Sequence, residues 1–271
     1  MSLRPISAFV FILAVLLSAP LAALAEHEGK LQILLLGDST TIGSVCRKHL
    51  PDGPHLEDVT QLLLAAEKDL PPANVINQGR DGDYLHGLLT GGRYDREVAK
   101  LPGIDYVLIR YGINDNSKRE TFPVNFPKDY RELIARLRKD FPSAIIVPMT
   151  IIPYNFADKE ERVNSLIRSV AEEETLPLFD IHARYEAELA HGPNMLNYRR
   201  YPLAKIPEAQ REWVKPFVRG ETVEVMDNRL DAHFRDLPGW FGDRHPNLAG
   251  YHVIGDETAK FLAKLIRDKK K

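Results

Sequence analysis

The sequence contains a serine and a histidine, far apart along the chain, that together could perform nucleophilic chemistry. Residues 37–40 read Gly-Asp-Ser-Thr directly after an apolar run, and residues 243–247 read Asp-Arg-His-Pro-Asn near the C-terminus. A serine hydroxyl is a poor nucleophile alone and needs a neighbouring base to take its proton. A histidine that stands accessible before a helix can titrate near neutral pH. We therefore take Ser39 as a candidate nucleophile and His245 as its candidate base.

Ser39 also has simpler local interpretations. A serine on a turn after a strand is a common helix N-cap, and such turns can also bind phosphate. A P-loop is excluded because no Gly-Lys-Ser/Thr follows, and the Gly-x-Ser-x-Gly nucleophile elbow is absent as well. The nucleophile hypothesis therefore depends on what else reaches the same place.

Two further segments could stabilise a negative charge that develops near Ser39. Gly79 lies in residues 77–82, Asn-Gln-Gly-Arg-Asp-Gly, where a glycine would let the backbone approach a ligand closely. Asn114 lies in residues 112–115, Gly-Ile-Asn-Asp, and its side-chain amide can donate a hydrogen bond to an oxyanion. A simple turn at Gly79 and an Asx turn at Asn114 remain open as alternatives.

Short apolar runs alternate with helical patterns along the chain. The expected strands are residues 31–36, 75–77, 106–111, 145–150 and 178–181, and helical apolar stripes cover residues 59–66, 130–137, 163–170 and 254–265. This alternation predicts an α/β fold, a three-layer α/β/α sandwich around a central five-stranded parallel sheet. Sites in such sheets lie at the carboxyl ends of the strands, which is where Ser39, Gly79 and Asn114 fall.

The chain of 271 residues divides into an N-terminal leader and one domain. Residues 1–25 have the features of a signal peptide: Arg4, an apolar stretch at 9–17 and Ala-Leu-Ala at 23–25. An uncleaved membrane anchor is the alternative. Residues 26–271 are expected to form a single domain with an insertion at about 184–240, rich in proline and aromatic residues, and no later segment is apolar enough to span a bilayer. We thus expect an exported protein, secreted or periplasmic, without stable membrane insertion after signal removal.

The net charge and the cysteine content limit the kinds of partner and cofactor that the protein could bind. A formal net charge of −2 gives no electrostatic basis for binding nucleic acid. A single cysteine, Cys46, allows no disulfide framework and no thiolate metal cage, and a nucleophilic Cys46 is a weaker hypothesis than a buried apolar one. No metal-ligand spacing is present, so we expect no cofactor. The oligomeric state stays open.

Taken in order, the four segments resemble the SGNH (GDSL-type) hydrolase superfamily. The segments are residues 37–40, the region around Gly79, residues 112–115 and residues 243–247. The resemblance extends from about residue 31 to the last helix and implies the flavodoxin-like fold of SGNH hydrolases. It further implies that Ser39 is the nucleophile and His245 the general base. The oxyanion hole would be formed by the Ser39 N–H, the Gly79 N–H and the Asn114 side chain.

One position departs from the family pattern. The family usually places an aspartate three residues before the histidine, where this chain has Gly242, and the nearest aspartate is Asp243, two residues before. Either Asp243 still reaches the imidazole or a backbone carbonyl orients it. Two arginines, Arg80 and Arg110, flank the second and third segments and could contact an anionic substrate or pair with carboxylates such as Asp81.

The Gly-Asp-Ser-Thr variant resembles family members that remove acetyl groups from polysaccharides. We therefore expect an exported serine esterase that acts on O-acetyl groups of a small or polymeric carbohydrate ester through an acyl-enzyme. A lysophospholipase or thioesterase that acts on acyl chains is one alternative. A catalytically idle carbohydrate-binding scaffold, suggested only by the shifted aspartate, is another.

Overall fold

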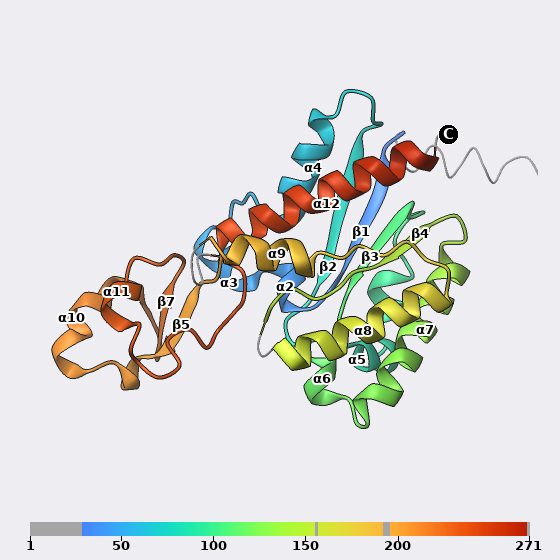
Figure 1. Ribbon diagram of the computed structural model, residues 1–271. Helices are drawn as coiled ribbons and strands as arrows, with labels where there is room; N and C mark the ends of the chain where they lie inside the picture. Colours follow the sequence, from blue (N-terminus) through green and yellow to red (C-terminus); the bar gives the residue numbers. More distant parts are fainter. Residues whose placement is uncertain (1–28, 155–156, 192–195, 270–271) are drawn as a thin grey trace, which may run out of the picture.

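The structure is a computed structural model that describes residues 29–154, 157–191 and 196–269. Its centre is a parallel sheet in the order β2-β1-β3-β4, formed by β1 (Leu31–Gly37), β2 (Ala73–Gly79), β3 (Tyr106–Arg110) and β4 (Ile145–Pro148). The α/β architecture with a parallel sheet between helices is the one the alternating sequence pattern predicted (Figure 1). The expected leader at residues 1–25 lies outside the described residues.

The predicted fifth strand is reduced to one isolated parallel bridge between Met149 and Phe179. The Phe179 N–H donates to Pro148 O at 2.9 Å and Phe179 O accepts from the Thr150 N–H at 3.1 Å. Pro177 precedes this point and cannot donate to a ladder, and α9 (His182–Leu189) begins soon after it. The described residues 178–181 make only this bridge, so the regular sheet has four strands.

Helices cover both faces of the sheet because residues of β1 alternate between two cores. Leu34 and Leu36 join a core formed with α5 (Leu85–Thr90), α7 (Phe122–Asp140) and α8 (Ala157–Glu173). Ile33 and Leu35 face the other core, formed with α4 (Leu56–Ala66), α9 and α12 (Leu248–Lys269). The sequence stripes at 59–66, 130–137, 163–170 and 254–265 fall within α4, α7, α8 and α12.

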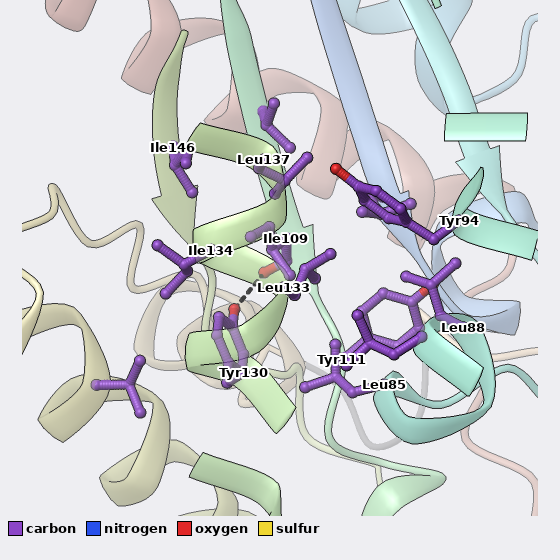
Figure 2. Packing of buried hydrophobic residues seen from close by; sticks show 14 of the residues in the cluster. Leu85, Leu88, Tyr94, Ile109, Tyr111, Tyr130, Leu133, Ile134, Leu137 and Ile146 are labelled. Carbon is purple, nitrogen blue, oxygen red and sulfur yellow. Dashed lines mark hydrogen bonds between the residues drawn. The ribbon is translucent and has the colours of Figure 1, made fainter. Parts of the chain in front are cut away.

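The apolar stripe of α7 covers one face of the central sheet. Figure 2 shows Tyr130, Leu133 and Leu137 of this helix packed toward the strands, with Ile109 of β3 between them. The Tyr130 hydroxyl donates to the Ile109 carbonyl at 3.1 Å, so the one polar atom of the stripe is satisfied inside the core. Leu133 is fully buried.

A second, smaller sheet lies within the segment expected as an insertion. It is antiparallel, in the order β5-β7-β6, with β5 (Arg199–Pro202), β6 (Val218–Arg219) and β7 (Thr222–Val225). It has its own apolar core, which includes Val223, Phe234 and Trp240. In Figure 1 this small sheet, with α10 (Arg211–Val214) and α11 (Asp231–Phe234), projects from the side of the main body.

The remaining elements are short. They are α2 (Ser39–Ile42), α3 (Ser44–His49), α6 (Asp115–Lys118), the π-helix η1 (Tyr94–Val98) and the 3₁₀ turns η2 (Leu203–Lys205), η3 (Glu208–Gln210) and η4 (Lys215–Phe217). Across the described ranges, no helix combines the length and apolar character needed to cross a membrane.

Candidate active site

The serine turn is built at the carboxyl end of β1. Asp38 caps α2, and its Oδ1 accepts hydrogen bonds from the Thr40 N–H at 2.9 Å and from the Thr40 hydroxyl at 2.7 Å. Burial raises the pKa of Asp38, and the bonds from Thr40 oppose that rise. Ser39 is the first residue of α2, at the sheet edge where the alternation predicted it.

The structure brings Ser39 and His245 together across 206 residues of chain. Ser39 Oγ lies 2.9 Å from His245 Nε2, and the His245 side chain is 11% exposed. His245 stands in the loop before α12, whose first turn is capped by Asn247 Oδ1 accepting from the Gly250 N–H at 3.0 Å. At this distance Nε2 can take the hydroxyl proton directly.

Asp243 reaches the other ring nitrogen despite its shifted position. Asp243 Oδ1 lies 2.6 Å from His245 Nδ1 and also accepts from the His245 backbone N–H at 3.1 Å. Burial alone would raise the pKa of Asp243, but the hydrogen bonds and charge of His245, with the charge of Arg200, hold it below its usual value. The carboxylate, rather than a backbone carbonyl, therefore orients the ring with Nδ1–H facing Asp243 and Nε2 facing Ser39.

Two tyrosines that the sequence analysis did not single out enclose the imidazole. Tyr198 stacks on His245 with ring centroids 5.6 Å apart, and Tyr154 meets the ring edge-on at 5.1 Å. The Tyr154 hydroxyl lies 3.4 Å from Nδ1. Tyr154 follows β4, so the rule that sites gather at the carboxyl ends of strands could have found it. Tyr198 lies just before β5, and no sequence signal pointed to it.

Asn114 and Gly79 were both expected to donate to an oxyanion, and each already donates a hydrogen bond within the protein. Asn114 precedes α6, and its Nδ2 donates to Asp83 O at 2.9 Å. The Gly79 N–H already donates to Asn77 Oδ1 at 2.9 Å. A Cβ on Gly79 would lie 2.4 Å from Ile42 N, so this glycine serves the close packing of β2 against α2. The expectation of an open donor at Gly79 is wrong in this structure.

Gly82, in the same segment, offers the open donor that Gly79 lacks. Its φ of +67° is in the left-handed region that favours glycine. Its N–H has no acceptor within the part of the chain that the structure describes. The next residue, Asp83, is the one whose carbonyl accepts from Asn114, so the two donors belong to one connected turn.

The structure places the two arginines named from the sequence in different environments. Arg110 is 2% exposed and donates to Thr40 O from below the serine turn, so the expected substrate contact is wrong for this residue. Burial lowers the pKa of Arg110, against the opposing charge of Asp38. Arg80 is exposed and has Glu97 at 3.9 Å, rather than Asp81 or Asp83, as its carboxylate. Its contact with substrate stays a prediction.

A pocket of about 270 Å³ adjoins the site. Asn114 and Tyr154 line it, which connects it to the oxyanion donors and to the imidazole. Its lining is mixed, with the apolar side chains Ile113, Ile151 and Val163 and the polar side chains Asn116, Ser117, Lys159 and Glu160. A pocket of this volume is near the lower end of the range for small-molecule sites.

Cys46 does not have the properties of a nucleophile. Its side chain is buried, and burial raises the pKa of the thiol to about 12. Within residues 29–154, 157–191 and 196–269, no three His, Cys, Asp or Glu side chains gather as they would around a metal ion.

Residues 35–201 match the model of the GDSL-like lipase/acylhydrolase family, and the chain belongs to that family. The family consists of hydrolases, so the chain is placed among hydrolases. The matched range includes Ser39 and Asn114 and ends before His245, whose place in the site is given by the geometry above. No curated protein matches the chain at a significant level.

Solved structures share the fold at low identity. An acetylxylan esterase from Geobacillus stearothermophilus is 17% identical with a TM-score of 0.55, over 86% of this chain and 95% of that one. A lipase/acylhydrolase from Enterococcus faecalis is 17% identical with a TM-score of 0.53, over the same shares. An alpha/beta hydrolase enzyme from the metagenome of Lake Arreo is 22% identical with a TM-score of 0.53, over 87% and 94%.

Proposed function

We propose that the protein is an exported serine esterase that removes O-acetyl groups from carbohydrate. The single observation that carries the proposal is the hydrogen-bonded chain from Ser39 Oγ through His245 to Asp243, at 2.9 and 2.6 Å. The Ser39 hydroxyl has a base beside it, and that base has a carboxylate that stabilises the imidazolium.

In the proposed mechanism Ser39 Oγ attacks the ester carbonyl carbon and its proton passes to His245 Nε2. The carbonyl oxygen becomes an oxyanion, which the Ser39 N–H, Asn114 Nδ2 and the Gly82 N–H stabilise. When the intermediate collapses, His245 returns the proton to the leaving sugar oxygen and an acyl-Ser39 remains. Water then attacks this ester, again with His245 as the base, and releases acetate.

The choice of a carbohydrate ester rests on the shape and lining of the adjoining pocket. Its polar lining residues, such as Asn116 and Ser117, could bind ring hydroxyl groups, and its apolar residues could pack on the C–H groups of a sugar ring. The likeness of the fold to an acetylxylan esterase is in keeping with this class. A long acyl chain would need an extended apolar groove, which a pocket of about 270 Å³ does not supply.

The idle-scaffold alternative has no remaining support. It was suggested only by the unusual position of Asp243, and that carboxylate contacts the imidazole. Export is proposed on the pattern of residues 1–25 alone. Mass spectrometry of the protein from the host periplasm or medium should find an N-terminus near residue 26.

The test of the activity uses two chromogenic esters and one natural substrate class. Purified protein should hydrolyse p-nitrophenyl acetate, leave p-nitrophenyl palmitate almost untouched, and release acetate from acetylated xylo-oligosaccharides or another acetylated glycan. A fluorophosphonate probe should add to Ser39, and Ser39→Ala should abolish both labelling and turnover. Preference for palmitate would favour the acyl-chain alternative, and absence of both labelling and turnover would reject the serine mechanism.

A further inference from the structure

The segment that leads into the small sheet pairs directly with the histidine loop. Asn197 forms an antiparallel bridge with Pro246, the Tyr198 N–H donates to His245 O at 3.3 Å, and the Asn247 N–H donates to Leu196 O at 2.8 Å. The Asn197 side chain also donates to Arg244 O. The loop that presents the base is therefore fixed by the insertion and not only by the α12 that follows it.

From the same segment, the first strand of the small sheet directs an arginine to the shifted aspartate. Arg200, on β5, places Nε 2.8 Å from Asp243 Oδ2. The other oxygen, Oδ1, is occupied by the two donors of His245. One carboxylate oxygen thus faces the imidazole and the other faces the guanidinium, and the side chain is held at both ends.

The spacing of Asp243 explains why a second anchor matters. A carboxylate two residues before the histidine accepts from the N–H of that histidine in a tight local turn. Rotation about its Cβ–Cγ bond is soft, and without a partner Oδ2 would be free to rotate the plane of the carboxylate away from Nδ1. A charge-assisted bond from an arginine is directional and fixes that plane.

We propose that Arg200 is a positioning residue for the Asp243–His245 pair, and that the small sheet is part of the catalytic apparatus because it supplies this arginine. The inference rests on the proposed esterase function. It deepens that function by assigning a task to a segment that otherwise stands beside the main fold (Figure 1). Arg200 touches neither substrate nor the reacting hydroxyl in this role and acts through the carboxylate.

The arginine also has an electrostatic consequence that can be measured. Among the described residues, the ionisable groups around His245 include Asp243, Asp38, Arg200 and the tyrosines 154 and 198, and Cys46 and Tyr251 line the same small pocket. The charge of Arg200 helps to keep the pKa of Asp243 low. Removing a positive charge from this group makes protonation easier, so the acid limb of the pH–rate profile should move to higher pH.

The experiment compares Arg200→Gln with Arg200→Lys and with Arg219→Gln. Arg219 is a matched control, an exposed arginine of the same small sheet that donates to the carbonyls of Pro216 and Val218. For Arg200→Gln we expect kcat on p-nitrophenyl acetate to fall roughly 10-fold to 100-fold, a range typical of groups that orient another functional side chain, with little change in KM. Arg200→Lys should keep the wild-type acid limb with an intermediate kcat, and Arg219→Gln should behave as wild type.

A readout that does not need turnover separates the two proposals. The Nδ1 proton of His245, held against Asp243 at 2.6 Å, should give a downfield ¹H NMR signal that weakens or moves in Arg200→Gln and persists in Arg219→Gln. If the wild type has this signal but hydrolyses no ester, the proposed function fails while the positioning role can still be read from the spectra. If folded Arg200→Gln keeps the wild-type kcat, pH profile and signal, Arg200 has no positioning role. Should Arg200→Gln not fold, an unchanged kcat and signal in Arg200→Lys, with no intermediate effect, would overturn the proposal equally.

Discussion

The serine turn and the histidine loop meet at one hydrogen bond, but they are held in place in different ways. The turn is supported by the main fold: Asp38 caps it, Arg110 donates a hydrogen bond to Thr40 O, and β1 leads directly into it. The loop is supported from outside, by Tyr198 and Arg200 of the inserted segment. The nucleophile thus depends on the buried core, whereas the orientation of the base depends on contacts between segments far apart in the sequence.

This difference separates mutations that should remove activity from those that should remove stability. A substitution at the hydrogen-bonded chain should act on the rate and leave the fold intact. A substitution in the core under the sheet should act on the fold and leave the rate of the folded molecules unchanged. The following predictions test the separation, beginning with the largest effect.

Ser39→Ala should cause the largest loss. Without the nucleophile no acyl-enzyme can form, and kcat/KM should fall roughly 10⁴-fold or more, as in other serine enzymes that lose this group. Steady-state hydrolysis of p-nitrophenyl acetate measures it. Ser169→Ala, a serine on α8 that bonds Glu173, is the control and should have wild-type activity. Substantial activity in Ser39→Ala would show that another group performs the attack.

Asp243→Asn should follow, with a loss of about 10³-fold to 10⁴-fold in kcat, because an amide no longer stabilises the imidazolium and can favour the wrong tautomer. The melting temperature should change little. Asp227→Asn removes an exposed carboxylate that pairs with Arg229, and should leave kcat unaltered. Equal rates in the two variants would mean that His245 works without Asp243.

Asn114→Ala should lower kcat by roughly 100-fold to 1,000-fold, the usual loss for one oxyanion donor, with a smaller effect on KM. Asn125→Ala is the matched control, since the exposed Asn125 side chain also donates to a backbone carbonyl, that of Glu120. A pure rise in KM for Asn114→Ala would instead assign the residue to substrate binding in the adjoining pocket.

Leu133→Ala should lower stability and leave the rate unchanged, the reverse of the three variants above. This side chain is fully buried in the α7 face of the core, so its truncation should lower the free energy of unfolding by about 2–5 kcal/mol while the folded enzyme keeps its kcat. Urea denaturation measures the change. Leu62→Ala, at a leucine 64% exposed on α4, should stay within about 0.5 kcal/mol of wild type. A loss of kcat in folded Leu133→Ala would link the core to the chemistry.

The last prediction concerns Asp115→Asn and the dependence of stability on pH. Burial raises the pKa of Asp115 to about 7, and its Oδ2 has no partner among the described residues. The folded protein therefore holds a proton that the unfolded chain releases near pH 4, and stability falls as pH rises from about 4 to 7, by up to roughly 1.4 kcal/mol per unit. Asparagine can still accept from the Leu85 N–H, so the variant should lose this slope. Denaturation at several pH values measures it, and parallel curves would place the proton elsewhere.

Much of the main fold could be predicted because its signals are local. The apolar run at 31–36 and the helical stripe at 130–137 state which faces are buried, and the structure confirms β1 and α7 there. Local signals also produced the error at residues 178–181. A short apolar run resembles a strand, but a local pattern does not report pairing, and here only Phe179 pairs with the neighbouring strand segment before α9 begins.

The site could be predicted less completely. Ser39 and His245 stand out by residue type and order, and the structure brings them to hydrogen-bond distance. The expectation of an open donor at Gly79 failed because a glycine in a motif does not reveal whether its N–H already has an acceptor, here Asn77. Arg110 was misplaced for a similar reason, since only packing determines whether an arginine after a strand turns inward beneath Thr40 or outward.

The sequence by itself determined the layered α/β architecture, the order of the four polar segments and the choice of Ser39 and His245 as candidate nucleophile and base. Periodicity and residue type express these directly, because each is a property of a few neighbouring residues. Only the tertiary structure decided that Asp243 reaches the ring, that Tyr154 and Tyr198 enclose it, and that Arg200 completes the arrangement. These contacts join residues 43 or more positions apart or depend on a side-chain rotation, and chain closure and packing, rather than any local pattern, set which of them form.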